Sequence, residues 1–219
     1  MSSLTFDIFW SVRSPYCYLA LDRIIEIQRC YDVEVNLRVV YPIAIRDPEF
    51  FKVRASKHYR TYFLLDSARI AECYGIPFRR PIPDPVVQDL VTSEISDEQP
   101  YIYSLTRLAA LAAEQGKGLA FLDQVTRLLW DGQTDDWHEG QHLAKAIQRA
   151  GLDANDMMHK ASTETARIDA LIFANQTSQA EAGHGGVPLM AFNKEPFFGQ
   201  DRIDLLLWRM KQNGLTERG

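Results

Sequence analysis

A serine and a proline at the start of the first helical pattern are the first residues that could do chemistry. Ser14 and Pro15 are the types preferred at the N-cap and first position of a helix, so the pair can simply begin one. The unpaired N–H groups of a helix start also stabilise an anion such as a thiolate, and the Ser14 hydroxyl can donate to it. The chain has no G-x-S-x-G segment and no plausible triad, so we do not expect Ser14 to be an acyl-transfer nucleophile.

A second candidate is the segment from His138 to His142, which reads H-E-G-Q-H. In zinc hydrolases two histidines at this spacing lie one helical turn apart and bind the metal, while the glutamate acts as the base. Residues 132–137 are typical of a loop, Gly140 disfavours helix inside the motif, and no convincing third ligand follows. We therefore expect a solvated helix start and no metal site.

The three cysteines Cys17, Cys30 and Cys73 are odd in number and widely spaced. This spacing predicts neither a disulfide framework nor a zinc site, and a reducing cytoplasm is the expected location. No stretch approaches the ~20 apolar residues of a membrane span, and the first residues lack an export signal. The net charge of -5 comes from dispersed carboxylates without a run of Lys or Arg, so nucleic acids and membranes are not expected partners.

The elements that must position these residues follow from hydrophobic periodicity. Residues 4–10 predict a buried strand, residues 15–29 a helix, and residues 33–41 a second strand. This order is the usual route to parallel strand pairing. With 219 residues, of which 46% are hydrophobic and 24% charged, the chain is long and apolar enough for one elaborated globular domain.

The middle of the chain, from Pro42 to about Ala182, is predicted to be helical. Residues 78–88 contain three prolines and predict an extended loop. Strand character returns at 187–192 and 196–198, followed by a last helix over 201–211. The pattern is therefore an open α/β sheet interrupted in its middle. The helical stretches predicted between the two halves are 55–74, 101–115, 119–130, 141–150 and 164–182.

Three stretches resemble a known family. They read FDIFWSVRSPYCYLALDRI near the start, DSARIAECYGIPF at 66–78, and GGVPLMAFNKEPFFGQDRIDLL near the end. They are similar to the 2-hydroxychromene-2-carboxylate isomerases and kappa-class glutathione transferases, which belong to the DsbA-like branch of the thioredoxin superfamily. The resemblance implies an α/β thioredoxin-like domain formed by residues 1–42 and 183–219. A helical insertion, residues 43–182, would interrupt it and pack its last helix on the core.

The resemblance assigns roles to residues at both ends of the chain. Ser14 stands where thioredoxins have the first cysteine of C-x-x-C, and would hydrogen-bond the glutathione sulfur. Pro188 matches the family's cis-proline, and Val187 would offer its backbone to the cysteinyl part of glutathione. Cys17 departs from the pattern, because these isomerases commonly have a serine there. A lone cysteine cannot close a disulfide with Ser14, so we interpret Cys17 as a small buried residue of the first helical turn.

Three more residues are implied in binding glutathione. Gln200 and Asp201 match the pair just before the last helix that holds the γ-glutamyl group, where an amine beside a carboxylate makes electrostatic sense. Lys57 is the candidate for the glycyl carboxylate, and a merely exposed lysine is the alternative. Most of the aromatic side chains are expected to be core residues, and the resemblance implies that a few of them face a flat substrate between the core and the insertion.

The resemblance implies a function as well. The expected protein is a cytoplasmic, homodimeric isomerase of aromatic-compound degradation that uses glutathione as cofactor. It would act on an aromatic or conjugated small molecule through addition and elimination of the glutathione thiolate. One alternative is a kappa-like glutathione transferase or a DsbA-like thiol oxidoreductase that uses Cys17. An alternative of another class is a non-catalytic thioredoxin-like binding module.

Overall fold

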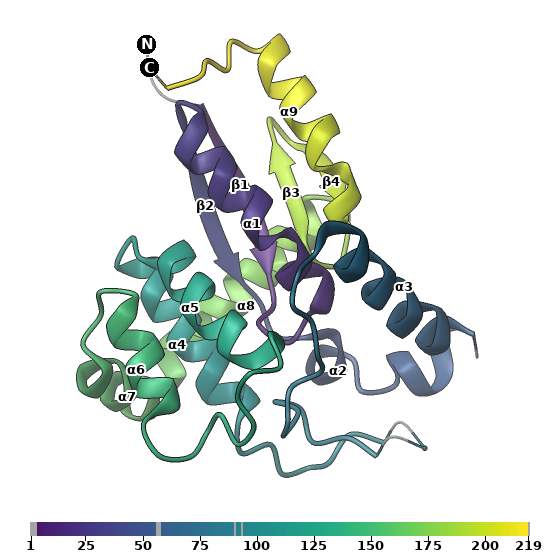
Figure 1. Cartoon of the computed structure of the whole chain (residues 1–219), viewed down its shortest axis with the longest axis vertical. Helices are drawn as coiled ribbons and strands as arrows, with labels where there is room; N and C mark the ends of the chain where they lie inside the picture. The colour runs from purple at the N-terminus through teal and green to yellow at the C-terminus, as the bar shows by residue number, and fades with distance from the viewer. Residues whose placement is uncertain (1–3, 56–57, 90, 93, 219) are drawn as a thin grey trace.

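The structure is a computed structural model and describes residues 4–55, 58–89, 91–92 and 94–218. Its sheet has the strand order β2-β1-β3-β4 (Figure 1). Strands β1 (Leu4–Trp10) and β2 (Val33–Val39) pair in parallel and are joined by helix α1 (Pro15–Cys30). Strands β3 (Leu189–Phe192) and β4 (Glu195–Phe198) continue the sheet in antiparallel pairing. The two predicted halves of the sheet therefore join as expected.

Strand β1 lies between β2 and β3, and side chains on both of its faces are buried. Phe6, Ile8 and Trp10 belong to the main core cluster, while Phe9 packs with Val40 and Leu189 on the opposite face. A strand covered on both sides reads as a nearly continuous apolar run, which is the pattern seen in its sequence. The burial of β1 fixes the position of its end, and α1 begins five residues after that end.

The C-terminal half of the sheet is a tight hairpin followed by a helix. Asn193 and Lys194 join β3 to β4 with φ of 52° and 66°, the pair of positive values that a type I′ turn requires. A short 3-10 turn, η2 (Gln200–Arg202), then leads into α9 (Ile203–Gln212). The predicted last helix is thus confirmed, although its first residues form the 3-10 turn instead.

Between β2 and β3 the described residues are mainly helical, as predicted. Helices α4 and α8 contact β2, and α5 contacts α1. The α4–α7 group gathers beside one end of the sheet, whereas α3 lies on the other side of α1 (Figure 1). The elements of this region are α2 (Ile43–Arg46), the π-helical turn η1 (Phe50–Arg54), α3 (Tyr59–Tyr74), α4 (Ile102–Glu114), α5 (Gly118–Trp130), α6 (His142–Arg149), α7 (Ala154–Thr163) and α8 (Thr165–Glu181).

Several features of this helical region differ from the prediction, since α2 and η1 lie where no helical stretch was predicted. Helix α7 was not predicted, although Asp153 caps it by accepting bonds from the N–H groups of Asn155 and Asp156, a signal present in the sequence. The helix predicted to begin at residue 55 begins at Tyr59. None of the helices in the described part of the chain is long and apolar enough to cross a membrane.

The proline-rich residues 78–88 form an extended loop, as predicted, and the loop is tied to the helices. The backbone N–H of Arg79 donates to the Trp130 carbonyl at 2.7 Å, and the Trp137 indole N–H donates to the Pro83 carbonyl at 2.8 Å. The Ile82–Pro83 peptide bond is cis. Because the loop is anchored at several points, it can present side chains in defined directions.

Candidate active site

Ser14 is the N-cap of α1, as its sequence context predicted. Its side-chain Oγ accepts a hydrogen bond from the Cys17 backbone N–H at 3.3 Å, and Pro15 follows at the first helical position. The Ser14 backbone N–H donates to the Ser11 carbonyl at 3.0 Å, which closes the turn between β1 and α1. The serine hydroxyl therefore lies among the backbone N–H groups of a helix start, where negative charge is stabilised.

Cys17 is buried one turn into α1, as the sequence predicted. Burial raises the pKa of its thiol to about 12, against smaller lowering contributions from hydrogen bonds with the Ser11 backbone and the Ser14 side chain. A thiol with this pKa is almost entirely protonated at neutral pH, and the thiolate is the reactive form. Cys17 is therefore a structural residue of the core and is poorly placed for disulfide exchange.

Ser14 opens into a pocket with a volume of about 720 Å³. Its walls come from the start of α1, the α2–α3 region, the proline-rich loop and the residues just before β3. The pocket reaches from Val187 on the sheet side to Arg80 on the side of the helical region. A volume of this size lies within the range typical of small-molecule sites.

The wall on the sheet side is built around a cis-proline. The Val187–Pro188 bond is cis, which confirms the prediction, and Val187 lines the same pocket as Ser14. Pro188 is not among the lining residues, and its carbonyl accepts a bond from the Gly199 N–H at 3.0 Å. His184 also lines this wall, and its ring stacks on Phe198 with 3.7 Å between the ring centroids.

Gln200 and Asp201 lie at the 3-10 turn before α9. They do not line the pocket. Gln200 is buried, and its side-chain Oε1 has no hydrogen-bond partner within the described residues. The Gln200 carbonyl accepts a bond from Arg23, while Asp201 is exposed and pairs with Arg202 at 2.8 Å. The third predicted contact, Lys57, lies outside the described residues.

The pocket also contains several arginines that the sequence analysis missed. Arg13, Arg46, Arg54, Arg60 and Arg80 all line it, against two carboxylates. These arginines are far apart in the sequence and belong to different elements. The sequence therefore has no run of basic residues that would predict them as a group. A chain with a net charge of -5 thus has a pocket with an excess of positive charge, which favours an anionic ligand.

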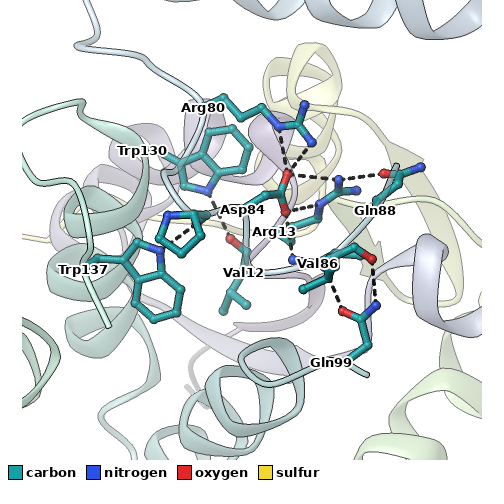
Figure 2. Close-up of polar contacts among 11 residues, drawn as sticks. Val12, Arg13, Arg80, Asp84, Val86, Gln88, Gln99, Trp130 and Trp137 are labelled. Atoms are coloured by element: carbon teal, nitrogen blue, oxygen red, sulfur yellow. Dashed lines mark hydrogen bonds and ion pairs between the residues drawn. The ribbon is translucent and has the colours of Figure 1, made fainter. Parts of the chain in front are cut away.

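Figure 2 shows how the proline-rich loop contacts the turn before Ser14. Arg13 donates to both oxygens of Asp84, from Nε at 3.0 Å and from Nη2 at 3.1 Å, and its Nη2 also donates to Gln88 at 3.2 Å. The Trp130 indole N–H donates to the Val12 carbonyl at 3.1 Å. Two consecutive residues of the β1–α1 turn are therefore held by partners more than 70 positions away in the sequence.

An aromatic wall lies between the two ends of the pocket. Tyr16, Phe50, Phe51, Tyr59 and Phe63 all line it, and Tyr59 stacks on Phe63 with 6.1 Å between centroids. The other rings pack edge to face or tilted, as aromatic side chains prefer. Such a wall offers flat apolar surface to a ring or a conjugated chain.

The H-E-x-x-H pattern does not lie in one helix. Helix α6 begins at His142, and Gly140 has a φ of 55°. His138 packs instead on Tyr101, with 4.6 Å between ring centroids, and beside Trp137. The two histidines therefore do not share a helical turn, as the zinc-hydrolase geometry requires.

Comparisons with known proteins agree with this geometry. The chain is 22% identical over 215 residues to glutathione S-transferase kappa 1 of Rattus norvegicus, covering 92% of this chain and 88% of that protein. Its fold matches a 2-hydroxychromene-2-carboxylate isomerase with a TM-score of 0.71, 20% identity and 95% coverage of both chains. It also matches the cytosolic disulfide reductase DsbM from Pseudomonas aeruginosa with GSH, with a TM-score of 0.62, 18% identity, and coverage of 95% of this chain and 100% of that one.

The family model for the DSBA-like thioredoxin domain matches residues 5–211, which is nearly the whole chain. Helix α1 and the cis-proline before β3 lie within the matched residues. The thioredoxin-type α/β fold with a helical insertion, expected from the sequence, is therefore confirmed. This chain belongs to the DsbA-like thioredoxin domain family.

Proposed function

We propose that this protein is a glutathione-dependent isomerase of an aromatic or conjugated small molecule, of the 2-hydroxychromene-2-carboxylate isomerase type. The observation that carries the proposal is the Ser14 hydroxyl at the tip of α1, on the wall of a large pocket that also includes Val187. A helix tip with a serine and no reactive cysteine suits the binding of a sulfur anion without its oxidation.

The polar groups in and beside the pocket fit glutathione, with donors for its sulfur and acceptors for its ammonium group. The helix tip offers N–H groups and a hydroxyl to the sulfur, and the residue before Pro188 offers its backbone to the cysteinyl part. Gln200 has a buried side-chain oxygen without a partner among the described residues, which suits an ammonium group such as that of the γ-glutamyl part. Asp201, one residue further, would add negative charge near the same group.

When bound, glutathione supplies a thiolate that adds to the conjugated system and leaves again unchanged after rotation or ring opening. The chain's own residues bind and orient the reactants. Ser14 donates to the sulfur and favours its deprotonated form, and the aromatic wall holds the conjugated part of the substrate. The bonds made and broken in this cycle balance, so no oxidant or reductant is consumed.

A thiol oxidoreductase that uses Cys17 fits less well. The Cys17 side chain is fully buried and its pKa is about 12, whereas a cysteine active in exchange is partly exposed with a lowered pKa. A kappa-like transferase would use the same sulfur position, and the 22% identity to the rat enzyme favours it as the second candidate. The two functions differ in whether glutathione stays on the product.

The proposal is tested by assaying 2-hydroxychromene-2-carboxylate with glutathione and with S-methylglutathione. We expect isomerisation only with glutathione and no loss of free thiol. Ser14→Ala should lower turnover roughly 10²-fold, because it removes a donor to a developing or bound anion. Asp153→Ala, which removes the cap of α7 far from the pocket, is the matched control. Full activity of Ser14→Ala, or a covalent glutathione product, would contradict the isomerase proposal.

We extend the proposal to the cellular location, the oligomeric state and the domain organisation of the protein. The resemblance supports a cytoplasmic homodimer with a discontinuous thioredoxin-like domain, residues 1–42 and 183–219, and an insertion at 43–182. The proposed packing of the last insertion helix on the core is supported by the buried Asn175 side chain of α8, which donates to the Val39 carbonyl of β2 at 3.0 Å. Light scattering checks the dimer, and a particle with the mass of one chain at micromolar concentration would contradict it.

A further inference from the structure

Three guanidinium groups and one carboxylate line the wall of the pocket that faces the helical region. We call Arg13, Arg60 and Arg80 the arginine cluster, and all three line the pocket together with Asp84. They come from the β1–α1 turn, helix α3 and the proline-rich loop respectively. They are also close enough to influence one another, because the pKa of Arg60 is lowered first by burial and then by the charges of Arg80 and Arg13.

Asp84 fixes the direction of two of these side chains. Its Oδ1 accepts bonds from Arg13 Nε at 3.0 Å and from the Val86 N–H at 2.8 Å. Its Oδ2 accepts from Arg13 Nη2 at 3.1 Å and from Arg80 Nε at 2.8 Å. Burial alone would raise the pKa of Asp84, but the charges and hydrogen bonds of the two arginines outweigh it and hold that pKa below its usual value. The carboxylate is therefore ionised and fully occupied.

Positive charge exceeds negative charge in the lining of the pocket. The arginine cluster contributes three cations and Asp84 one anion, in a pocket with apolar walls where a charge interacts more strongly than in water. Asp89, which does not line the pocket, also acts on Arg60. Arg13 binds Asp84 in a bidentate way through Nε and Nη2, so its Nη1 takes no part in that pair.

This cluster lies on a different wall from the groups expected to hold glutathione. Val187, which lines the pocket, stands beside the cis-proline on the side of β3. Gln200 and Asp201 do not line the pocket and lie in the 3-10 turn that follows β4. Arg13, Arg80 and Asp84 lie instead where the proline-rich loop meets the turn before Ser14 (Figure 2).

We propose that the arginine cluster, held by Asp84, is an anion site that binds the carboxylate of the second substrate and selects acidic acceptors over neutral ones. The identity of that second substrate rests on the proposed function, whereas the existence of the anion site does not. Asp84 is a positioning residue in this arrangement, and Arg80 and Arg60 determine specificity.

Calorimetry with two isosteric probes tests the site. 2-Hydroxycinnamate and its neutral amide are titrated into the whole protein in the presence of saturating S-methylglutathione, which occupies the cofactor site without reacting. We expect the acid to bind at least tenfold more tightly than the amide. Arg80→Gln should weaken binding of the acid about tenfold and change binding of the amide less than twofold, because it removes a charge-assisted pair.

Arg79→Gln is the matched control. It removes the same charge from the neighbouring position, but Arg79 pairs with Asp135 and does not line the pocket. The control should keep the tenfold preference, and circular dichroism checks that both variants are folded. Equal binding of acid and amide to the wild-type protein, or equal losses in the two variants, would overturn the anion site.

The same titrations separate this inference from the proposed function. If S-methylglutathione does not bind while the acid still binds tenfold better than the amide, the glutathione proposal fails and the anion site stands. If S-methylglutathione binds and the two probes bind alike, the anion site fails and the glutathione proposal stands.

Discussion

The two walls of the pocket differ in the chemical groups that they present. On the sheet side, the tip of α1 and the segment before the cis-proline line the pocket, and carbonyls of that segment accept bonds from Arg46 and Gln179. Arg46 Nη2 donates to the Gly185 carbonyl at 2.9 Å, and Gln179 Nε2 donates to the Gly186 carbonyl at 2.7 Å. On the opposite wall, charged and aromatic side chains of the β1–α1 turn, η1, α3 and the proline-rich loop line the pocket.

This difference indicates that the two walls bind different ligands. A backbone wall can be preserved while side chains vary, so it suits a ligand that many members of a family share. A side-chain wall is easily changed by substitution and suits a ligand that differs from one member to another. We therefore expect substitutions on the sheet side to affect glutathione, and those on the opposite side to affect the second substrate or the stability of the loop.

The largest expected effect is on the side-chain wall. Asp84→Asn leaves buried guanidinium groups without their counter-charge and should lower the free energy of unfolding by about 3 kcal/mol. Because the folded pKa of Asp84 lies below 3.8, its stabilisation is present at neutral pH and is lost as the pH falls through that folded pKa. The difference from wild type should therefore shrink in acid.

Urea unfolding at pH 7 and at pH 3 measures both effects of the Asp84 substitution. Asp153→Asn, on a carboxylate that caps an exposed helix, is the control and should lower stability by about 1 kcal/mol or less. A loss for Asp84→Asn as small as that of the control at pH 7 would show that the loop is not held by this carboxylate.

The second-largest expected effect tests whether the wall on the sheet side contributes to glutathione binding. A Cβ at Gly186 would lie 2.4 Å from the Phe198 ring and 2.9 Å from the His184 ring, so Gly186→Ala must push this ring pair. We expect about tenfold weaker binding of S-methylglutathione by calorimetry, equivalent to ~1.4 kcal/mol. Gly185→Ala is the matched control, because nothing lies within 4 Å of its added Cβ. Equal affinities of the two variants would remove this wall from the glutathione site.

The smallest effect concerns the cysteine beneath the helix tip. Cys17→Ser should change isomerase activity less than twofold, since the thiol is buried and protonated at neutral pH. Iodoacetamide at pH 7.5 should alkylate the exposed Cys73 in the native protein and leave Cys17 unmodified, as read by mass spectrometry. Alkylation of Cys17 that parallels a loss of activity would favour the oxidoreductase alternative.

The sequence predicted the sheet side of the molecule well and the opposite wall poorly. Strand and helix periodicity and the Ser14–Pro15 cap are local signals, so they can be read from neighbouring residues. The cis-proline was implied by the family resemblance alone, and the structure confirms it. The arginine cluster joins residues 13, 60 and 80, and only the folded chain brings them to one wall. The pocket-facing aromatic residues could not be selected from the sequence either, because buried and pocket-lining rings share the same periodicity.

The Ser14 hydroxyl at the tip of α1 affects how the site responds to oxidising conditions. Where a thioredoxin presents a sulfur, this chain presents the Ser14 hydroxyl, and its nearest sulfur, Cys17, is sealed in the core. If a thiol binds at this helix as proposed, neither the Ser14 hydroxyl nor the buried Cys17 thiol would form a mixed disulfide with it. In that case the bound thiol would not be consumed by exchange with these two residues.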